Sequence, residues 1–140
     1  MSAVVTHVGL CVEDLERARR FYTEALGFTF ASDLKPADDA TGKLLGIDPP
    51  VGLTAVYLTL GTFTLELLHY DRTGNPDFRP RVMNEPGLTH LSITADDLPG
   101  TVERVREHGG EVIESSNLGV AVLVRDPDGQ IVELLAKRDA

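Results

Sequence analysis

The feature that most constrains the fold is an internal repeat, in which ten residues near the start of the chain return without a gap in its second half. Thr6–Leu15 aligns with Thr89–Leu98: each copy opens with Thr and His, continues with alternating aliphatic residues, and closes with an acidic pair and Leu. Such repetition indicates two copies of one supersecondary unit. The alternation predicts a strand in each copy, with His7 and His90 on the face opposite the aliphatic side chains.

The segments after these strands repeat as well. Asp14 and Asp97 can each cap a helix, the first ending at Gly27 and the second at Gly109-Gly110. Further strands are predicted at Phe28–Ser32, Leu53–Leu60, Thr62–His69, Glu111–Glu114, Gly119–Arg125 and Gln130–Ala136, the last two flanking the turn Asp126-Pro127-Asp128-Gly129, for which no catalytic role is predicted. The sequence therefore predicts an α+β fold of two tandem βαβββ modules.

We expect these modules to form one domain over residues 1–140. Module one covers about 4–70, a polar and proline-rich connection covers about 71–87, and module two covers about 88–137. An insert at residues 33–52 breaks the symmetry, and a short helical turn is predicted there at Lys43 to Gly46.

The charge balance narrows the possible partners. Thirteen basic residues against 22 acidic ones give a net charge of −9, which repels phosphate backbones and anionic lipid, so neither nucleic acid nor a membrane is expected as a partner. Cys11 is the single cysteine, so an internal disulfide is ruled out. The first residues show no basic stretch and no long apolar run, so we expect neither a signal peptide nor a membrane span, and a cytoplasmic protein.

Each module supplies one histidine on its first strand and one glutamate on its last. The glutamates, Glu66 and Glu133, stand in otherwise apolar strands, where a carboxylate without a partner is costly to bury. If the curved mixed sheets enclose one cavity, both glutamates can face it together with His7 and His90. Two imidazoles and two carboxylates suit one divalent metal ion, with Zn, Ni, Co, Mn and Fe all compatible. Taken singly, each residue is more simply structural; the repeat favours the metal site.

Other polar residues are interpreted as structural. His69 has the opposite parity to Glu66 and is expected to face away from the cavity, and His108 is expected to stabilise the end of a helix or to be exposed. Cys11 shares the face of His7 and can line the cavity as a small apolar group. The arginines of the connection are expected to be solvated, with binding of an anionic substrate group as the alternative: Arg72, Arg79 and Arg81.

The chain resembles the vicinal oxygen chelate superfamily. The residues that carry this resemblance are the Thr6-His7 and Thr89-His90 openings, the helix end from Phe21 to Phe28, and the turn Asp126 to Gly129 followed by Val132-Glu133-Leu134. That superfamily includes glyoxalase I, methylmalonyl-CoA epimerase, extradiol dioxygenases and proteins of fosfomycin or bleomycin resistance. The resemblance extends over nearly the whole chain, from about residue 4 to 137.

The ligand pattern is most similar to that of bacterial glyoxalase I. His7, Glu66, His90 and Glu133 match its His/Glu/His/Glu set, whereas the epimerases usually carry Gln at the position of Glu66. Dioxygenases and fosfomycin-modifying members generally use three protein ligands, and bleomycin-binding members lack the set. The chain departs from glyoxalase I at Cys11, where an arginine that helps to hold glutathione typically stands, and in its long insert.

The resemblance implies a metal-dependent lyase or isomerase that transfers a proton α to a carbonyl, with Ni, Co, Zn or Mn as cofactor. It implies that Glu133 is the principal base and Glu66 its partner on the opposite face of the substrate, while His7 and His90 hold the metal. The expected substrate is a small molecule with vicinal oxygens, and the expected assembly is a homodimer.

Two other functions remain open at this point. One is an Fe(II) extradiol-type dioxygenase with His7, His90 and Glu133 as ligands. The other is a non-catalytic protein that binds a small molecule, of the resistance type.

Overall fold

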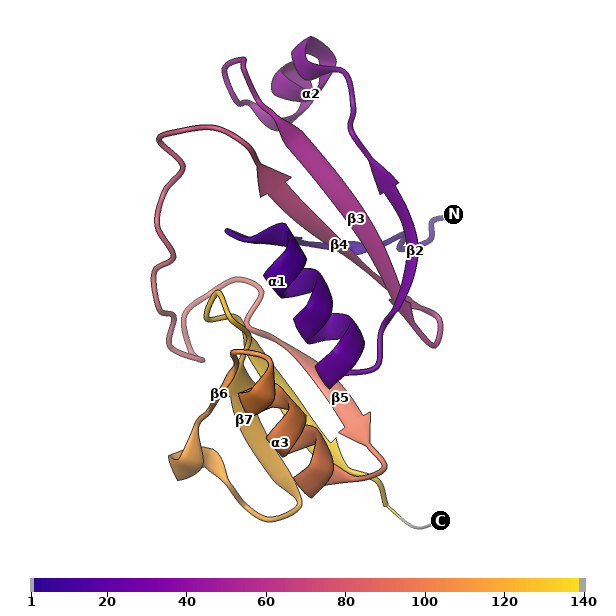
Figure 1. Ribbon diagram of the computed structural model, residues 1–140, viewed down its shortest axis with the longest axis vertical. Coiled ribbons are helices and arrows are strands. Elements are labelled where there is room, and N and C mark those ends of the chain that lie inside the picture. The colour runs from indigo at the N-terminus through magenta and orange to yellow at the C-terminus, as the bar shows by residue number, and fades with distance from the viewer. Residues whose placement is uncertain (1, 139–140) are drawn as a thin grey trace.

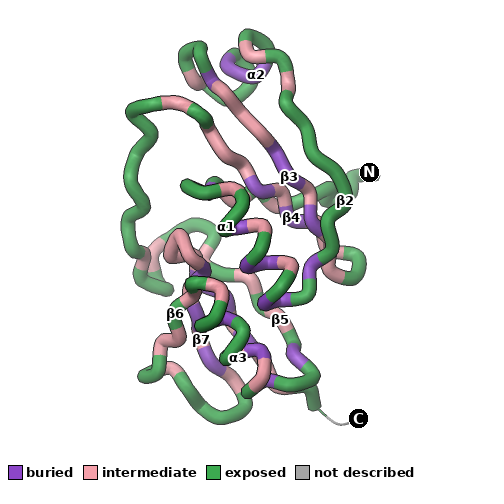
Figure 2. Tube along the Cα trace, in the orientation of Figure 1, coloured by how far each residue is buried: buried purple, intermediate pink, exposed green. Residues whose placement is uncertain are grey.

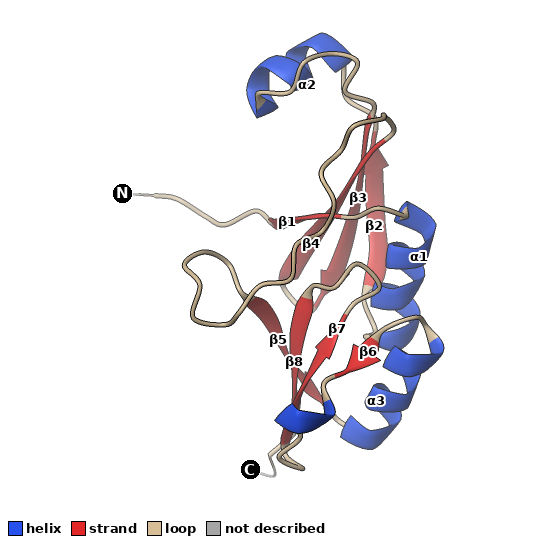
Figure 3. Cartoon of the chain, turned by 90° about the vertical axis from the view of Figure 1, so that its left-hand side faces the viewer, coloured by secondary structure: helices blue, strands red, loops and turns tan. Residues whose placement is uncertain are grey.

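The structure, a computed structural model, describes residues 2–138 and has a mixed α+β architecture. Two four-stranded mixed sheets lie one after the other along the molecule, each built from one of the two repeated modules (Figure 1). In the turned view of Figure 3, the helices that follow the first strand of each module lie on one side of the sheets. The expected repeat of two βαβββ modules is confirmed.

The first module forms a sheet with the strand order β1-β4-β3-β2. β1 runs parallel to β4, and the other pairs are antiparallel. Its elements are β1 (Val8–Cys11), α1 (Leu15–Arg20), a π-helical turn (Phe21–Ala25), β2 (Thr29–Leu34), α2 (Asp38–Leu45), β3 (Leu53–Leu60) and β4 (Phe63–Tyr70).

The second module repeats this topology with the order β5-β8-β7-β6, and β5 is again parallel to its neighbour β8. β1 and β5 therefore occupy the same edge position in their respective sheets. The elements of this module are β5 (His90–Ala95), α3 (Leu98–Glu107), β6 (Glu111–Val112), a 3₁₀ turn (Glu114–Ser116), β7 (Ala121–Arg125) and β8 (Ile131–Ala136). No helix within residues 2–138 is long and apolar enough to cross a membrane.

The predicted helix caps are present. The carboxylate of Asp14 accepts a hydrogen bond from the Arg17 amide, and that of Asp97 accepts one from the Gly100 amide, both at 3.0 Å. Each cap satisfies an amide that has no partner within its helix. The first helix changes to π geometry at Phe21, which the sequence pattern did not indicate.

The insert forms more helix than the sequence predicted. Instead of a short turn at 43–46, α2 spans eight residues and ends at Gly46, whose φ of 69° is the left-handed conformation that favours glycine. Asp38 explains the difference, because its carboxylate accepts hydrogen bonds from the Val51 and Gly52 amides just before β3. This contact joins the first turn of α2 to the sheet. It stabilises a helix whose apolar residues show only a weak helical periodicity.

One core extends through both modules. Burial is concentrated where the helices face the sheets (Figure 2), and Phe21, Tyr22 and Val105 are fully buried there. The phenol of Tyr22 donates a 2.7 Å hydrogen bond to Asp126, a buried residue in the turn between β7 and β8. The predicted turn therefore also joins module two to the helix of module one.

Tyr22→Phe is expected to lower the free energy of unfolding by about 1–3 kcal/mol, because it leaves a buried carboxylate oxygen of Asp126 without its donor. Burial and the neighbouring carboxylate raise the pKa of Tyr22 well above 10.0. The contribution of the phenol should therefore be complete below pH 10 and decline as the pH rises through the folded-state pKa.

Urea unfolding of wild type and Tyr22→Phe at several pH values measures this contribution. Tyr70→Phe serves as the control, since it removes a hydroxyl at the wall of a cavity instead of the core. Equal stability of Tyr22→Phe and wild type at neutral pH would refute the assigned role.

Candidate metal centre

The first module brings His7 and Glu66 together on the open side of its sheet. β1 pairs in parallel with β4, so Gly9 lies opposite Glu66 and the histidine lies just before the strand. His7 Nε2 is 3.4 Å from Glu66 Oε1, and the two side chains are 34% and 13% exposed. Glu66 stands between the buried residues Leu65 and Leu67, whose side chains point to the opposite, helix-covered face.

The second module builds the matching pair. Ser92 of β5 lies opposite Glu133 of β8, and His90 begins the edge strand. His90 Nε2 is 4.0 Å from Glu133 Oε1, with side chains 29% and 34% exposed. The repeated sequence therefore creates two His–Glu pairs in equivalent positions.

Both histidines are oriented by the threonine that precedes them. Thr6 Oγ1 lies 3.0 Å from His7 Nδ1, and Thr89 Oγ1 lies 2.8 Å from His90 Nδ1. In the tautomer that is protonated at Nδ1, the ring donates to the threonine and its Nε2 lone pair faces the glutamate. A ligating histidine commonly has such a second hydrogen bond.

The glutamates are held by different hydroxyl groups. Tyr57 donates a 2.6 Å hydrogen bond to Glu66 Oε2, and this bond, together with burial and the carboxylate charge, raises the pKa of the tyrosine to about 12. Ser92 donates a 2.8 Å hydrogen bond to Glu133 Oε1. The more exposed Glu133 is therefore less confined than Glu66, which a bulky phenol holds on one side.

The two pairs do not meet within the chain. In residues 2–138, no group of three or more His, Cys, Asp or Glu side chains is placed to hold a metal ion. The expected cavity that encloses all four ligands is not shown within the described chain, in which the two sheets lie one after the other (Figure 3). Each pair contains half of the predicted donor set.

The sequence matches the family described as "Glyoxalase/Bleomycin resistance protein/Dioxygenase superfamily" over residues 4–134. The chain belongs to this superfamily. It is 26% identical to a lactoylglutathione lyase of Salmonella typhimurium over an alignment of 140 positions, which covers 96% of the chain and 93% of that protein. It is also 29% identical to an ethylmalonyl-CoA/methylmalonyl-CoA epimerase of Cereibacter sphaeroides, covering 79% of the chain and 75% of the epimerase.

Longer plant relatives share the same region. A probable chloroplastic lactoylglutathione lyase of Arabidopsis thaliana is 29% identical over 94% of the chain, which spans only 35% of the plant protein's length. Among solved structures, a glyoxalase family protein of Bacillus cereus has a TM-score of 0.81 at 20% identity, with 96% of this chain and 94% of that chain covered. Glyoxalase I of Leishmania major has a TM-score of 0.69 at 26% identity, with coverages of 96% and 87%.

The remaining histidines of this glyoxalase-superfamily chain make structural contacts. His69 Nδ1 lies 3.4 Å from the Val12 carbonyl oxygen, away from the Glu66 side of the sheet. His108 caps α3 as predicted, and its Nε2 also lies 2.8 Å from Glu24 Oε2 in module one. Neither belongs to the His–Glu pairs.

The arginines of the connection are occupied locally. Arg72 donates to the Asp48 carbonyl at 3.0 Å, Arg79 pairs with Glu85 at 2.6 Å, and Arg81 donates to the Pro86 carbonyl at 2.7 Å. These contacts fix the three side chains against the connection and its neighbouring loop.

Tyr57 is the site residue that the sequence analysis missed. Leu60 pairs with Phe63 across the tight turn at Gly61 and Thr62, and this register places Tyr57 opposite Glu66. The hairpin signal was present in the sequence, so counting outward from the turn would have found the tyrosine.

An apolar recess adjoins the second pair. It has a volume of about 420 Å³ and lies along the edge strand β5, where His90 and Ser92 meet Phe28 and Phe63 of module one. This superfamily member thus offers an apolar surface directly beside one of its two candidate half-sites.

Proposed function

We propose that the protein is a metal-dependent lyase or isomerase that transfers a proton α to a carbonyl, in the manner of glyoxalase I or of the epimerases. The observation that carries the proposal is the duplicated His–Glu pair, in which each imidazole turns Nε2 toward the carboxylate of a neighbouring strand. Similarity to lactoylglutathione lyases and to an acyl-CoA epimerase supports this class of reaction.

The donor set fits a divalent ion. His7, Glu66, His90 and Glu133 would hold it, and Ni, Co, Zn or Mn suits two imidazoles and two carboxylates. Because the pairs are separate within one chain, we propose that the protein is a homodimer in which the first pair of one protomer meets the second pair of its partner. A two-fold axis that forms one such site forms a second, identical one.

The bound metal would supply Lewis-acid stabilisation of the negative charge that develops on the substrate's vicinal oxygens. Glu133 then takes the proton from the carbon next to the carbonyl and returns it to the same or an adjacent carbon. Its greater exposure and single serine donor leave this carboxylate freer to move than Glu66. Glu66 serves as its partner on the opposite face of the substrate, oriented by Tyr57.

Metal content per chain, measured by mass spectrometry on protein purified without chelators, tests the proposal. Wild type should carry Ni, Co, Zn or Mn near one ion per chain, and Glu66→Ala should lose most of it. Glu111→Ala, which removes an exposed carboxylate from β6, is the matched control and should keep wild-type metal.

The other outcomes point to other functions. Iron that is unaffected by Glu66→Ala would favour a dioxygenase that uses three ligands, and oxygen consumption would then be measured. Absence of metal after reconstitution with each candidate ion would leave a small-molecule-binding protein and refute the proposal.

A further inference from the structure

The repeat gives Glu66 and Glu133 equivalent places in their sheets, but the residues around the two glutamates differ. Glu66 has two neighbours directly opposite it on adjacent strands, Gly9 of β1 and Tyr57 of β3. Residues that lie opposite one another on paired strands share a face of the sheet. Both neighbours therefore lie on the side of the sheet that holds the His7–Glu66 pair.

The second pair has other residues at the same two positions. Beside Glu133, Ser92 of β5 occupies the position of Gly9. Leu123 of β7 occupies the position of Tyr57. The two glutamates therefore receive their hydroxyl groups from opposite sides, the first from the hairpin strand and the second from the edge strand. One duplicated backbone thus carries two different environments for a carboxylate.

The hydrogen bond from Tyr57 makes the two carboxylate oxygens of Glu66 different. The phenol donates to Oε2 at 2.6 Å, while Oε1 faces His7 Nε2 at 3.4 Å. Gly9 leaves Oε1 open, because it has no side chain, whereas a Cβ at this position would already lie 3.5 Å from that oxygen. One oxygen of Glu66 is therefore occupied by a donor, and the oxygen beside the histidine is left free.

The serine of the second pair does not separate the oxygens of Glu133 in this way. Ser92 donates a 2.8 Å hydrogen bond to Oε1, which is also the oxygen that lies 4.0 Å from His90 Nε2. An ion placed between His90 and Oε1 would have to share this oxygen with the serine. The hydroxyl of Ser92 therefore does not prepare its carboxylate for a metal as the hydroxyl of Tyr57 does.

Tyr57 also contacts the imidazole of the first pair. Its ring meets that of His7 edge to face, with centroids 5.5 Å apart and ring planes at 76°. This is a favourable arrangement for two aromatic rings. One side chain thus contacts both predicted ligands of the first pair, whereas the equivalent Leu123 has neither a hydroxyl group nor an aromatic ring.

We propose that Tyr57 is a positioning residue of the metal centre, which holds Glu66 so that only Oε1 is available to the ion beside His7. This assignment rests on the proposed function. A carboxylate without a donor on Oε2 can turn and bind an ion through either oxygen or through both. The first pair is therefore the ordered half of the centre, and the second pair is the half whose carboxylate stays free to move.

The affinity of the metal-free protein for Co²⁺, measured by competition with a chelating dye, tests this role. Tyr57→Phe keeps the ring beside His7 and removes only the hydroxyl. We expect it to bind Co²⁺ about 10–100-fold more weakly, which is the usual effect of removing a group that orients a metal ligand. Ser92→Ala removes the hydroxyl of the second pair and should bind Co²⁺ no more weakly than wild type.

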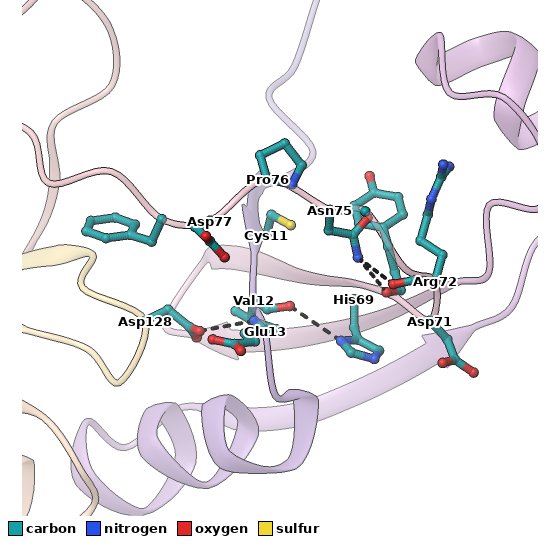
Figure 4. Close-up of a pocket in the computed structure, with 13 residues that line it drawn as sticks. Cys11, Val12, Glu13, His69, Asp71, Arg72, Asn75, Pro76, Asp77 and Asp128 are labelled. Atoms are coloured by element: carbon teal, nitrogen blue, oxygen red, sulfur yellow. Dashed lines mark hydrogen bonds between the residues drawn. The ribbon is translucent and has the colours of Figure 1, made fainter.

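Tyr70→Phe is the matched control. Tyr70 lies on the same strand as Glu66, but it lines a separate cavity of about 520 Å³ where β1 and β4 end (Figure 4). Removing its hydroxyl should leave the affinity for Co²⁺ unchanged.

The visible absorption of bound Co²⁺ gives a second readout, which a loss of stability would not change. In Tyr57→Phe, Glu66 is free to bind through both oxygens, and a higher coordination number weakens the absorption of Co²⁺ at saturation. Wild-type affinity in Tyr57→Phe, an equal loss in Ser92→Ala, or an unchanged spectrum would overturn the role of Tyr57 alone. Wild type that binds no Co²⁺ would overturn the metal centre itself, and this assignment with it.

Discussion

His7→Ala and His90→Ala are each expected to lose nearly all metal and activity as purified variants, and to regain about a quarter of the wild-type level when they are co-expressed. Each single variant damages both sites of its homodimer, because every site needs the first pair of one protomer and the second pair of the other. In a random mixture half of the dimers are mixed, and each mixed dimer holds one undamaged site. Metal analysis and turnover of the unselected mixture measure this quarter, and mixed dimers isolated by tandem tags should reach about half of the wild-type level.

The matched control is co-expression of His7→Ala with Glu66→Ala. Both variants damage the same pair, so a mixed dimer contains no complete site and no activity should return. If His7→Ala with His90→Ala also remains inactive while the mixed dimer is shown to form, the shared centre is disproved. If either single variant retains its metal, the remaining predicted ligands are sufficient to hold the ion.

Glu133→Gln is expected to retain much of its metal and to lose turnover by about 10²–10⁴-fold, the usual contribution of a positioned general base. The amide keeps an oxygen that can accept the hydrogen bond from Ser92, so the strand geometry should persist. It cannot take up the proton. The measurement pairs turnover on dicarbonyl and acyl-CoA thioester substrates with metal analysis of the same preparation.

Ser92→Ala distinguishes a positioning effect from the loss of the base. It removes the 2.8 Å hydrogen bond to Glu133 and leaves the carboxylate in place, so turnover should fall far less than in Glu133→Gln. Equal turnover of Glu133→Gln and wild type would show that Glu133 is not the base. Glu66 would then be the next residue to test.

Much of the fold could be predicted because its determinants are local and occur twice. Alternation fixes the face of His7 and His90, and acidic caps start α1 and α3 at the expected residues. The extent of α2 could not be predicted, since it depends on Asp38 reaching amides thirteen and fourteen residues further along the chain. Local propensity contains no information about such a contact.

The candidate site could likewise be predicted only in part. The pairing of His7 with Glu66, and of His90 with Glu133, follows from the repeated strands. The separation of the two pairs does not, because it depends on how one module packs against the other. That packing depends on long-range contacts such as the hydrogen bond between Tyr22 and Asp126. In the sequence, Asp126 is recognisable only as a turn residue, so this contact could not be predicted.

The contact between α1 and the second module has a consequence for how the duplicated chain holds together. Asp126 accepts the hydrogen bond from the Tyr22 phenol, and Asp128 accepts the one from the Glu13 amide. Both aspartates belong to the other copy of the repeat. Either copy alone would expose to water the phenol of Tyr22 or the carboxylate of Asp126, both of which are buried in the whole chain. We therefore expect the two halves to unfold together in a single transition, so that the repeat is visible in the sequence although neither copy folds independently.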